Sequence, residues 1–158
     1  SYLVQGRGIH ADTAASFASL FFLGITFGRF LCGFFAEKLG DKRLIRIGIF
    51  TAMVGAVLIG LPVPFDGLAL AGLITIGLGC APIYPSIIHS TPFNFGKENS
   101  QSIIGIQMAC AYVGTTLMPP LFGWLASVAG IGLYPFYLLL FAVLMLVMSE
   151  RLNRAVAK

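Results

Sequence analysis

Three long stretches of the chain contain no charged residue, and this feature limits the fold more than any other. They cover residues 47–65, 67–96 and 99–149. A transmembrane helix needs about 20 mainly apolar residues, so the first two stretches each hold one span and the third holds two. A further stretch, residues 13–36, is interrupted only by Arg29. We therefore expect five spans near residues 13–36, 46–62, 67–91, 99–127 and 133–149.

The composition leads to the same fold class. Hydrophobic residues make up 58% of the 158 residues and charged residues only 10%, whereas soluble domains carry about 25% charged residues. A water-soluble fold of this size could not hide so much apolar surface. In lipid, every backbone group must be paired within the protein, and these stretches lack the alternating polarity of barrel strands. The sequence thus predicts an all-α, polytopic membrane helix bundle.

The basic residues of the connectors fall on one side when the five spans are threaded in order. That side holds Lys38, Lys42, Arg43, Arg46, Lys97, Arg151, Arg154 and Lys158. The other side holds Arg7 and Asp66. Because basic loops favour the cytoplasmic face, we expect a multi-pass protein of the cell membrane with its N-terminus outside and its C-terminus in the cytoplasm. The net charge of +4 reflects this bias and does not indicate nucleic-acid binding.

The sequence shows no motif typical of an enzyme or a metal site. Cys32, Cys80 and Cys110 all fall inside spans, where we expect them to be small apolar packing residues. We find no His-Glu zinc motif, no paired intramembrane carboxylates and no serine matched to a base. We therefore expect no enzymatic activity, no cofactor and no metal. The start at Ser1, without a signal-peptide core, suggests a fragment of a longer protein.

The first and fourth spans carry polar side chains that are candidates for a solute pathway. Arg29 lies about two turns from the cytoplasmic end of its span, on one stripe with Thr26. An Arg at this depth costs about 2.5–3.5 kcal/mol on insertion scales, so it should face protein or water. It is either a structurally paired residue or part of the substrate or ion route. Gln107, on a face with Thr115, binds either a polar solute or a neighbouring helix.

The third span has the most polar pattern. One of its faces carries Thr75, Gly79, Pro82, Ser86 and His89. Pro82 and Pro85 each remove a helical hydrogen bond, which is typical of transporter sites, although such prolines can also serve packing alone. Tyr84 adds a hydroxyl, and His89 is either an interfacial residue or a proton relay. The second and fifth spans are apolar all round and should face lipid.

The connector between the first two spans carries the most specific motif. It runs from Gly28 to Arg43 and includes Gly33, Glu37, Lys38, Gly40, Asp41 and Lys42. This stretch resembles the signature loop of the major facilitator superfamily, in which a Gly is followed by an acidic residue, a basic residue, a Gly and a basic pair. Glu37 stands where that family more often has Asp, and Asp41 takes a position that is often basic. Residues 81–85 and 105–112 look most like the fucose-permease-like sugar:proton symporter branch.

The resemblance implies that residues 1–158 form helices eight to twelve of a twelve-helix fold, without most of helix seven. The third span would line the central cavity, and the Gly33–Arg43 loop would help to latch the two halves. The implied partners are a small-molecule solute, the lipid bilayer and the missing N-terminal half. The implied function is secondary active transport of a small polar solute, a sugar with protons, by alternating access. The alternatives are a drug or metabolite exporter of the same superfamily and a non-transporting membrane scaffold or sensor.

Overall fold

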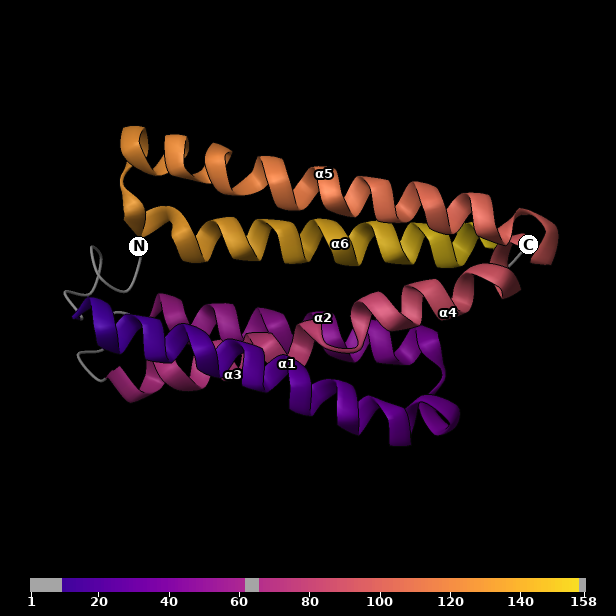
Figure 1. Ribbon diagram of the computed structural model, residues 1–158, viewed down its shortest axis with the longest axis horizontal. Coiled ribbons are helices and arrows are strands. Elements are labelled where there is room, and N and C mark those ends of the chain that lie inside the picture. The colour runs from indigo at the N-terminus through magenta and orange to yellow at the C-terminus, as the bar shows by residue number, and fades with distance from the viewer. Residues whose placement is uncertain (1–9, 62–65, 157–158) are drawn as a thin grey trace.

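The computed structural model describes residues 10–61 and 66–156. Within these ranges it does not describe the side chains of eight residues, namely Ala11, Ala14, Phe17, Ala18, Ala36, Glu37, Asp66 and Ile131. The chain forms α1 (Ala11–Leu39), α2 (Asp41–Gly60), α3 (Asp66–Cys80), α4 (Ile83–Phe95), α5 (Lys97–Ala129), the 3-10 helix η2 (Ile131–Leu133) and α6 (Tyr134–Val156). The helices run along one long axis, with α5 and α6 in one layer and α1, α2 and α3 in the other (Figure 1).

The expected all-α membrane helix bundle is confirmed. Within the described residues, four helical stretches are long and apolar enough to cross a membrane, and they cover residues 41–60, 67–95, 97–129 and 134–156. The apolar part of α1 is shorter, at Ser19–Phe35, although the helix itself is 29 residues long. The second of these four stretches begins with α3 and ends with α4, so the expected span at residues 67–91 is built from two helices.

Two connectors are shorter than the sequence predicts. The charged residues 41–43, expected in a loop, form the first turn of α2, and Gly40 alone separates α1 from α2. Gly96 separates α4 from α5 in the same way. Both glycines have a positive φ, 74° and 82°, which residues with a Cβ rarely adopt. A single glycine therefore reverses the chain at each connector. The charged residues beside it can remain in the helix, because their long side chains reach water from the helix end.

Glycines bring α3 into direct backbone contact with α1 and α2. A Cβ built on Gly79 of α3 would lie 2.6 Å from the carbonyl oxygen of Gly48 on α2. A Cβ built on Gly24 of α1 would lie 2.7 Å from the carbonyl oxygen of Ile74 on α3. Such distances leave no room for a methyl group, so small residues set the helix spacing, as is common in membranes. Ile49 of α2, which is 1% exposed, anchors the adjoining core.

The third expected span is interrupted between α3 and α4, as the prolines predict. α3 ends at Cys80 and α4 begins at Ile83. Pro82 and Pro85 have no N–H, so the carbonyls four residues before them receive no helical hydrogen bond. Beyond the break the chain changes direction (Figure 1). As a result α3 packs against α1 and α2, whereas α4 packs against α2 and α5.

The position of α2 corrects the expectation that the second span faces lipid on all sides. α2 packs between α3 and α6. One of its faces is buried and includes Ile49 and Ile59, while the opposite face exposes Phe50 and Val54. An all-apolar helix can pack against lipid or protein on any face, so its composition could not predict this placement. α6 fits the expectation better, because most of its large apolar side chains are exposed.

α5 is the helix that is least buried by the rest of the described chain. Ser100 is its buried residue, and its contacts lie with α4 at one end and η2 at the other. Near η2, the Tyr137 hydroxyl of α6 lies 3.4 Å from the sulfur of Met118 on α5. The ring centroids of Phe122 and Tyr137 lie 4.9 Å apart. Among the four candidate spans, α5 also has the lowest hydropathy.

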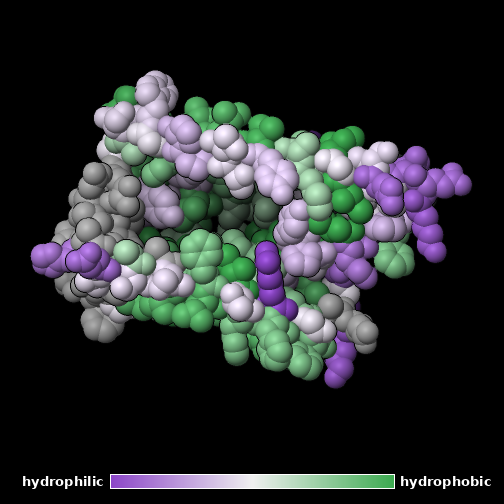
Figure 2. Space-filling model, viewed as in Figure 1, coloured by the Kyte–Doolittle hydropathy of each residue, from purple (hydrophilic) through white to green (hydrophobic). Residues whose placement is uncertain are grey.

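The basic residues of the connectors lie together at one end of the bundle, which we call the basic end. It holds the α1–α2 and α4–α5 connectors and the end of α6. Hydrophilic side chains accordingly gather at this end, on the right in Figure 2. Here Arg46 of α2 makes a two-point ion pair with Glu150 of α6, with 2.7 Å between Nη2 and Oε2. This pair joins the two layers at the surface.

Candidate functional site

A cavity of about 590 Å³ lies in the wedge where α4 turns away from α1, and we call it the Arg29 cavity. Its lining is Arg29, Cys32, Gly33, Gly40, Asp41, Leu44, Pro82, Pro85, Ser86, His89 and Phe93. The break at Pro82 opens this space, because α3 stays against α1 while α4 does not. The cavity is open at Gly33, since a Cβ built there meets nothing within 4 Å. The cavity thus brings together predicted site residues from α1, the α1–α2 connector and α4.

The charged groups of the Arg29 cavity are unequally paired. His89 Nδ1 lies 2.8 Å from Asp41 Oδ2, so α4 is tied to the start of α2. The Asp41 side chain is 18% exposed, and that of His89 is 71% exposed. Arg29 is exposed to the cavity, and no described side chain forms a hydrogen bond or an ion pair with it. The cavity therefore offers one cation whose charge the described protein does not balance.

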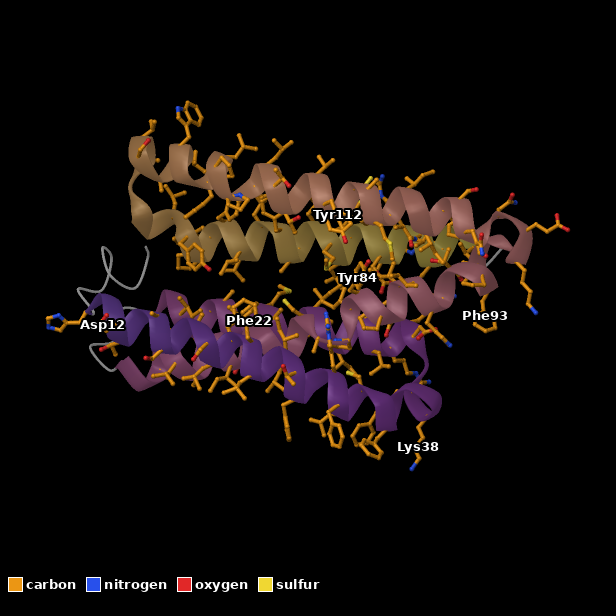
Figure 3. All side chains as sticks on the ribbon, in the orientation of Figure 1. Asp12, Phe22, Lys38, Tyr84, Phe93 and Tyr112 are labelled. Carbon is orange, nitrogen blue, oxygen red and sulfur yellow. The ribbon has the colours of Figure 1, made fainter. Side chains whose placement is uncertain are left out.

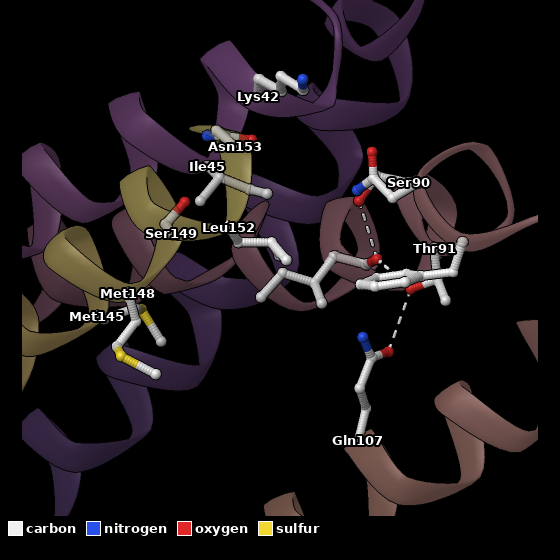
Figure 4. A pocket seen from close by; sticks show the side chains of 13 residues that line it. Lys42, Ile45, Ser90, Thr91, Gln107, Met145, Met148, Ser149, Leu152 and Asn153 are labelled. Atoms are coloured by element: carbon white, nitrogen blue, oxygen red, sulfur yellow. Dashed lines mark hydrogen bonds between the residues drawn. The ribbon is translucent and has the colours of Figure 1, made fainter. Parts of the chain in front are cut away.

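A second cavity of about 300 Å³ is lined by another part of α4 and by α2, α5 and α6, and we call it the Gln107 cavity (Figure 4). Thr91 is 1% exposed. Its hydroxyl oxygen lies 3.2 Å from Gln107 Oε1 and 2.8 Å from the Ile87 carbonyl oxygen. Gln107 therefore bonds a neighbouring helix and also lines a cavity. Asn153 Nδ2 is buried without a hydrogen-bond partner among the described residues. The cavity offers amide and hydroxyl groups in an apolar frame.

Three predicted pathway residues form hydrogen bonds within their own helices. The hydroxyls of Thr26, Thr75 and Thr115 donate to backbone carbonyls one turn earlier at 2.9, 2.6 and 3.0 Å. Threonine in an apolar helix satisfies its hydroxyl in this way, so its presence does not by itself mark a pathway. Tyr84, in the first turn of α4, is 42% exposed. In Figure 3 it is labelled where the layer of α5 and α6 faces the layer of α1.

The polar face expected along the third span is divided by the helix break. Pro82, Ser86 and His89 line the Arg29 cavity. Gly79 instead packs against α2, and Thr75 bonds its own helix. A uniform helical period runs through all five positions, but the real chain changes direction at residue 82, so residues before and after it do not share a face.

The predicted gating residues surround the α1–α2 connector. Gly40, Asp41, Lys42 and Arg43 help to line a shallow depression of about 340 Å³ at the basic end. Lys42 also contributes to the Gln107 cavity. Lys38 is exposed at the end of α1 and points away from the bundle (Figure 3). The side chain of Glu37 lies outside the described part of the chain.

Several cavity residues escaped the sequence analysis. Thr91 and Asn94 lie at or beyond the end of the predicted third span, and Asn153 lies beyond the fifth, among the basic residues of the tail. Ser90, Thr91 and Asn94 form a short group of polar residues that could have marked the first of these positions, whereas Asn153 follows charged residues and had no signal of its own. Within the described residues, no group of three or more His, Cys, Asp and Glu side chains could hold a metal ion.

The long apolar helices define a polytopic membrane protein. One of its spans is interrupted, and a cavity with polar groups lies on each side of that span, which is typical of transporters. The family model of the Major Facilitator Superfamily matches residues 1–152. The chain therefore belongs to this superfamily of membrane transporters. Neither the curated proteins nor the solved structures contain a match to it.

Proposed function

We propose that the chain forms the C-terminal wall of a longer secondary active transporter that carries a small polar solute, a sugar in symport with protons, by alternating access. In this proposal the basic end is cytoplasmic. The observation that carries it is the pair of cavities beside α4, the second half of the interrupted span, each combining polar groups with an apolar frame. Discontinuous helices supply the solute and ion sites of many secondary transporters.

The Gln107 cavity supports a hydroxyl-rich solute. The amides of Gln107 and Asn153 can each donate and accept, as sugar hydroxyls do. The unpaired Nδ2 of Asn153 is a donor that a solute oxygen could satisfy, since a buried donor without a partner costs about 1–3 kcal/mol. The apolar residues of the same cavity, such as Met148, would cover the carbon side of a sugar ring.

The Asp41–His89 pair supports coupling to protons and a latch at the connector. The imidazole is the side chain that changes charge nearest to neutral pH. Its Nδ1 lies 2.8 Å from Asp41 Oδ2, so a proton relay at this position would act directly on the bond between α4 and the start of α2. The connector could therefore latch and release while the two halves rock.

Transport by the full-length protein in proteoliposomes tests the proposal. An imposed proton gradient should drive uptake of a member of a sugar panel, and Gln107→Ala should weaken it. Tyr84→Phe should also reduce uptake, whereas Thr75→Ala should have the smallest effect because that hydroxyl bonds its own helix. If uptake persists unchanged in all three variants, the assignment of the pathway is wrong.

The latch has its own test. Asp41→Asn removes the carboxylate charge and His89→Gln the imidazole from the pair that joins the connector to α4, which weakens the pair, so each should slow transport more than it weakens solute binding. The comparison needs the uptake rate and the equilibrium affinity of the same preparation. An equal loss in both quantities would contradict the gating role.

A further inference from the structure

Arg29 sits where a helix pair opens into a wedge. The residue directly before it, Gly28, allows α1 to approach α3 so closely that an added Cβ would lie 3.2 Å from the Leu78 carbonyl oxygen. Beyond Pro82, α4 leaves α1, and the space between them is the Arg29 cavity. Arg29 is therefore an exposed residue that lines this space, and it does not lie in a packed interface.

The positive charge of Arg29 has no ion-pair partner among the described residues of this cavity. Ten residues, or about 15 Å of helix, separate Arg29 from the end of α1 at Leu39, so the side chain begins well inside the apolar part of the helix. A charged group at such depth normally pairs with a partner of opposite sign. The nearest carboxylate of the lining, Asp41, is bonded to His89, and no described carboxylate pairs with Arg29.

We propose that the Arg29 cavity binds the carboxylate of the transported solute, so that the cargo is a sugar acid and not a neutral sugar. This inference rests on the proposed transport function and narrows its substrate class. A guanidinium binds a carboxylate through two parallel hydrogen bonds, which a neutral hydroxyl group cannot reproduce. The remaining lining provides the Ser86 hydroxyl for a sugar hydroxyl and apolar walls at Leu44 and Phe93.

The size of the site agrees with this ligand. A volume of about 590 Å³ falls within the range of small-molecule sites, roughly 300–1,000 Å³. Gly33 matters here because it lies one turn after Arg29 in the lining, and a Cβ built there meets nothing within 4 Å, so the space at this position is open. A larger side chain at position 33 would fill that space without touching the charge, which gives a second, independent way to block the site.

The test compares glucuronate with glucose, which differ in a carboxylate and a hydroxymethyl group at the same carbon. Equilibrium binding of each labelled compound is measured on the purified full-length protein, for the natural sequence and for Arg29→Gln, Arg29→Lys and Gly33→Leu. Arg151→Gln is the matched control, because it removes the same charge from an exposed position of α6 at the basic end. Uptake of both compounds by proteoliposomes is measured in parallel.

We expect glucuronate to bind more tightly than glucose, and Arg29→Gln to weaken glucuronate binding by about 10- to 100-fold, the loss typical of a hydrogen-bonded charge. Arg29→Lys should lose less, Gly33→Leu should lose binding through steric exclusion, and Arg151→Gln should stay within about twofold. Equal affinities for the two compounds would overturn the inference. It would also fall if Gly33→Leu and a folded Arg29 variant both kept glucuronate affinity within about twofold of the natural protein.

The two levels of the proposal fail separately. Proton-driven glucose uptake without glucuronate binding would overturn the carboxylate site and leave the proposed function intact. Glucuronate binding that depends on Arg29 but is not followed by uptake would support the site and contradict transport. If Arg29→Gln does not fold, as judged by gel filtration, Gly33→Leu decides the outcome.

Discussion

Replacing Gly79 with alanine tests the close packing of α2 against α3. The added methyl group would lie 2.6 Å from the Gly48 carbonyl oxygen and 2.9 Å from the Ala52 Cα. Both are backbone atoms, so no change of rotamer can relieve the contact and the helices must separate. Overpacking costs about 1–3 kcal/mol, and this rigid contact belongs at the upper end, while alanine regains about 1 kcal/mol of helix propensity over glycine. The expected net loss is therefore about 2 kcal/mol of unfolding free energy.

The assay is thermal unfolding of the full-length protein in lipid nanodiscs. For a protein of roughly 150–250 residues, a loss of about 2 kcal/mol lowers the unfolding midpoint by roughly 4–8 °C, and the shift becomes smaller as the chain becomes longer. Gly105→Ala on α5 is the matched control, because a Cβ built there meets nothing within 4 Å. That variant should be neutral or more stable by up to about 1 kcal/mol. Equal midpoints for Gly79→Ala and Gly105→Ala would refute the argument that backbone contact sets the α2–α3 spacing.

Three further predictions concern other contacts. A double-mutant cycle of Arg46→Gln and Glu150→Gln should show favourable coupling that falls as salt is raised, because the pair is solvent-exposed, and coupling independent of salt would contradict this. Gln107→Leu should lower the unfolding free energy by no more than about 1 kcal/mol, since Thr91 keeps its bond to the Ile87 carbonyl, and a urea or SDS titration measures this. Lys97→Cys in inside-out vesicles should react with a membrane-impermeant maleimide, whereas in right-side-out vesicles it should react only after permeabilisation, and the reverse pattern would overturn the proposed orientation.

The helices of this chain could be predicted from its sequence because lipid imposes a simple rule. A span must be long and apolar, and the charge-free stretches satisfy that requirement without reference to packing. The interruption at Pro82 was also predictable, because the missing N–H is a covalent property. The place of α2 was not, since a helix such as residues 47–61 is apolar on all faces and its pattern does not distinguish lipid from a protein neighbour.

The cavities were predictable only in part. Arg29 and Gln107 stood out because a polar group inside a span is costly, and both line a cavity. The bond between Asp41 and His89 joins residues on different helices, and its existence depends on the direction that α4 takes after the break. A helical period assumes a straight helix, so it could not relate the position of Thr75 on α3 to that of His89 on α4. Pairing between helices is a property of tertiary structure and leaves no mark on either segment alone.

The sparse contacts of α5 bear on how the chain is inserted into a membrane during synthesis. A segment enters the bilayer from the translocon according to its own hydropathy, and α5 has the lowest hydropathy of the four candidate spans. Gly130 places α6 directly behind it, and Phe122 meets Tyr137 across the turn. We infer that α5 and α6 enter the lipid as one helical hairpin, in which the more apolar α6 draws its neighbour across. The turn around η2 thus acts first in membrane insertion, by joining α5 to α6, and only later in the folded protein.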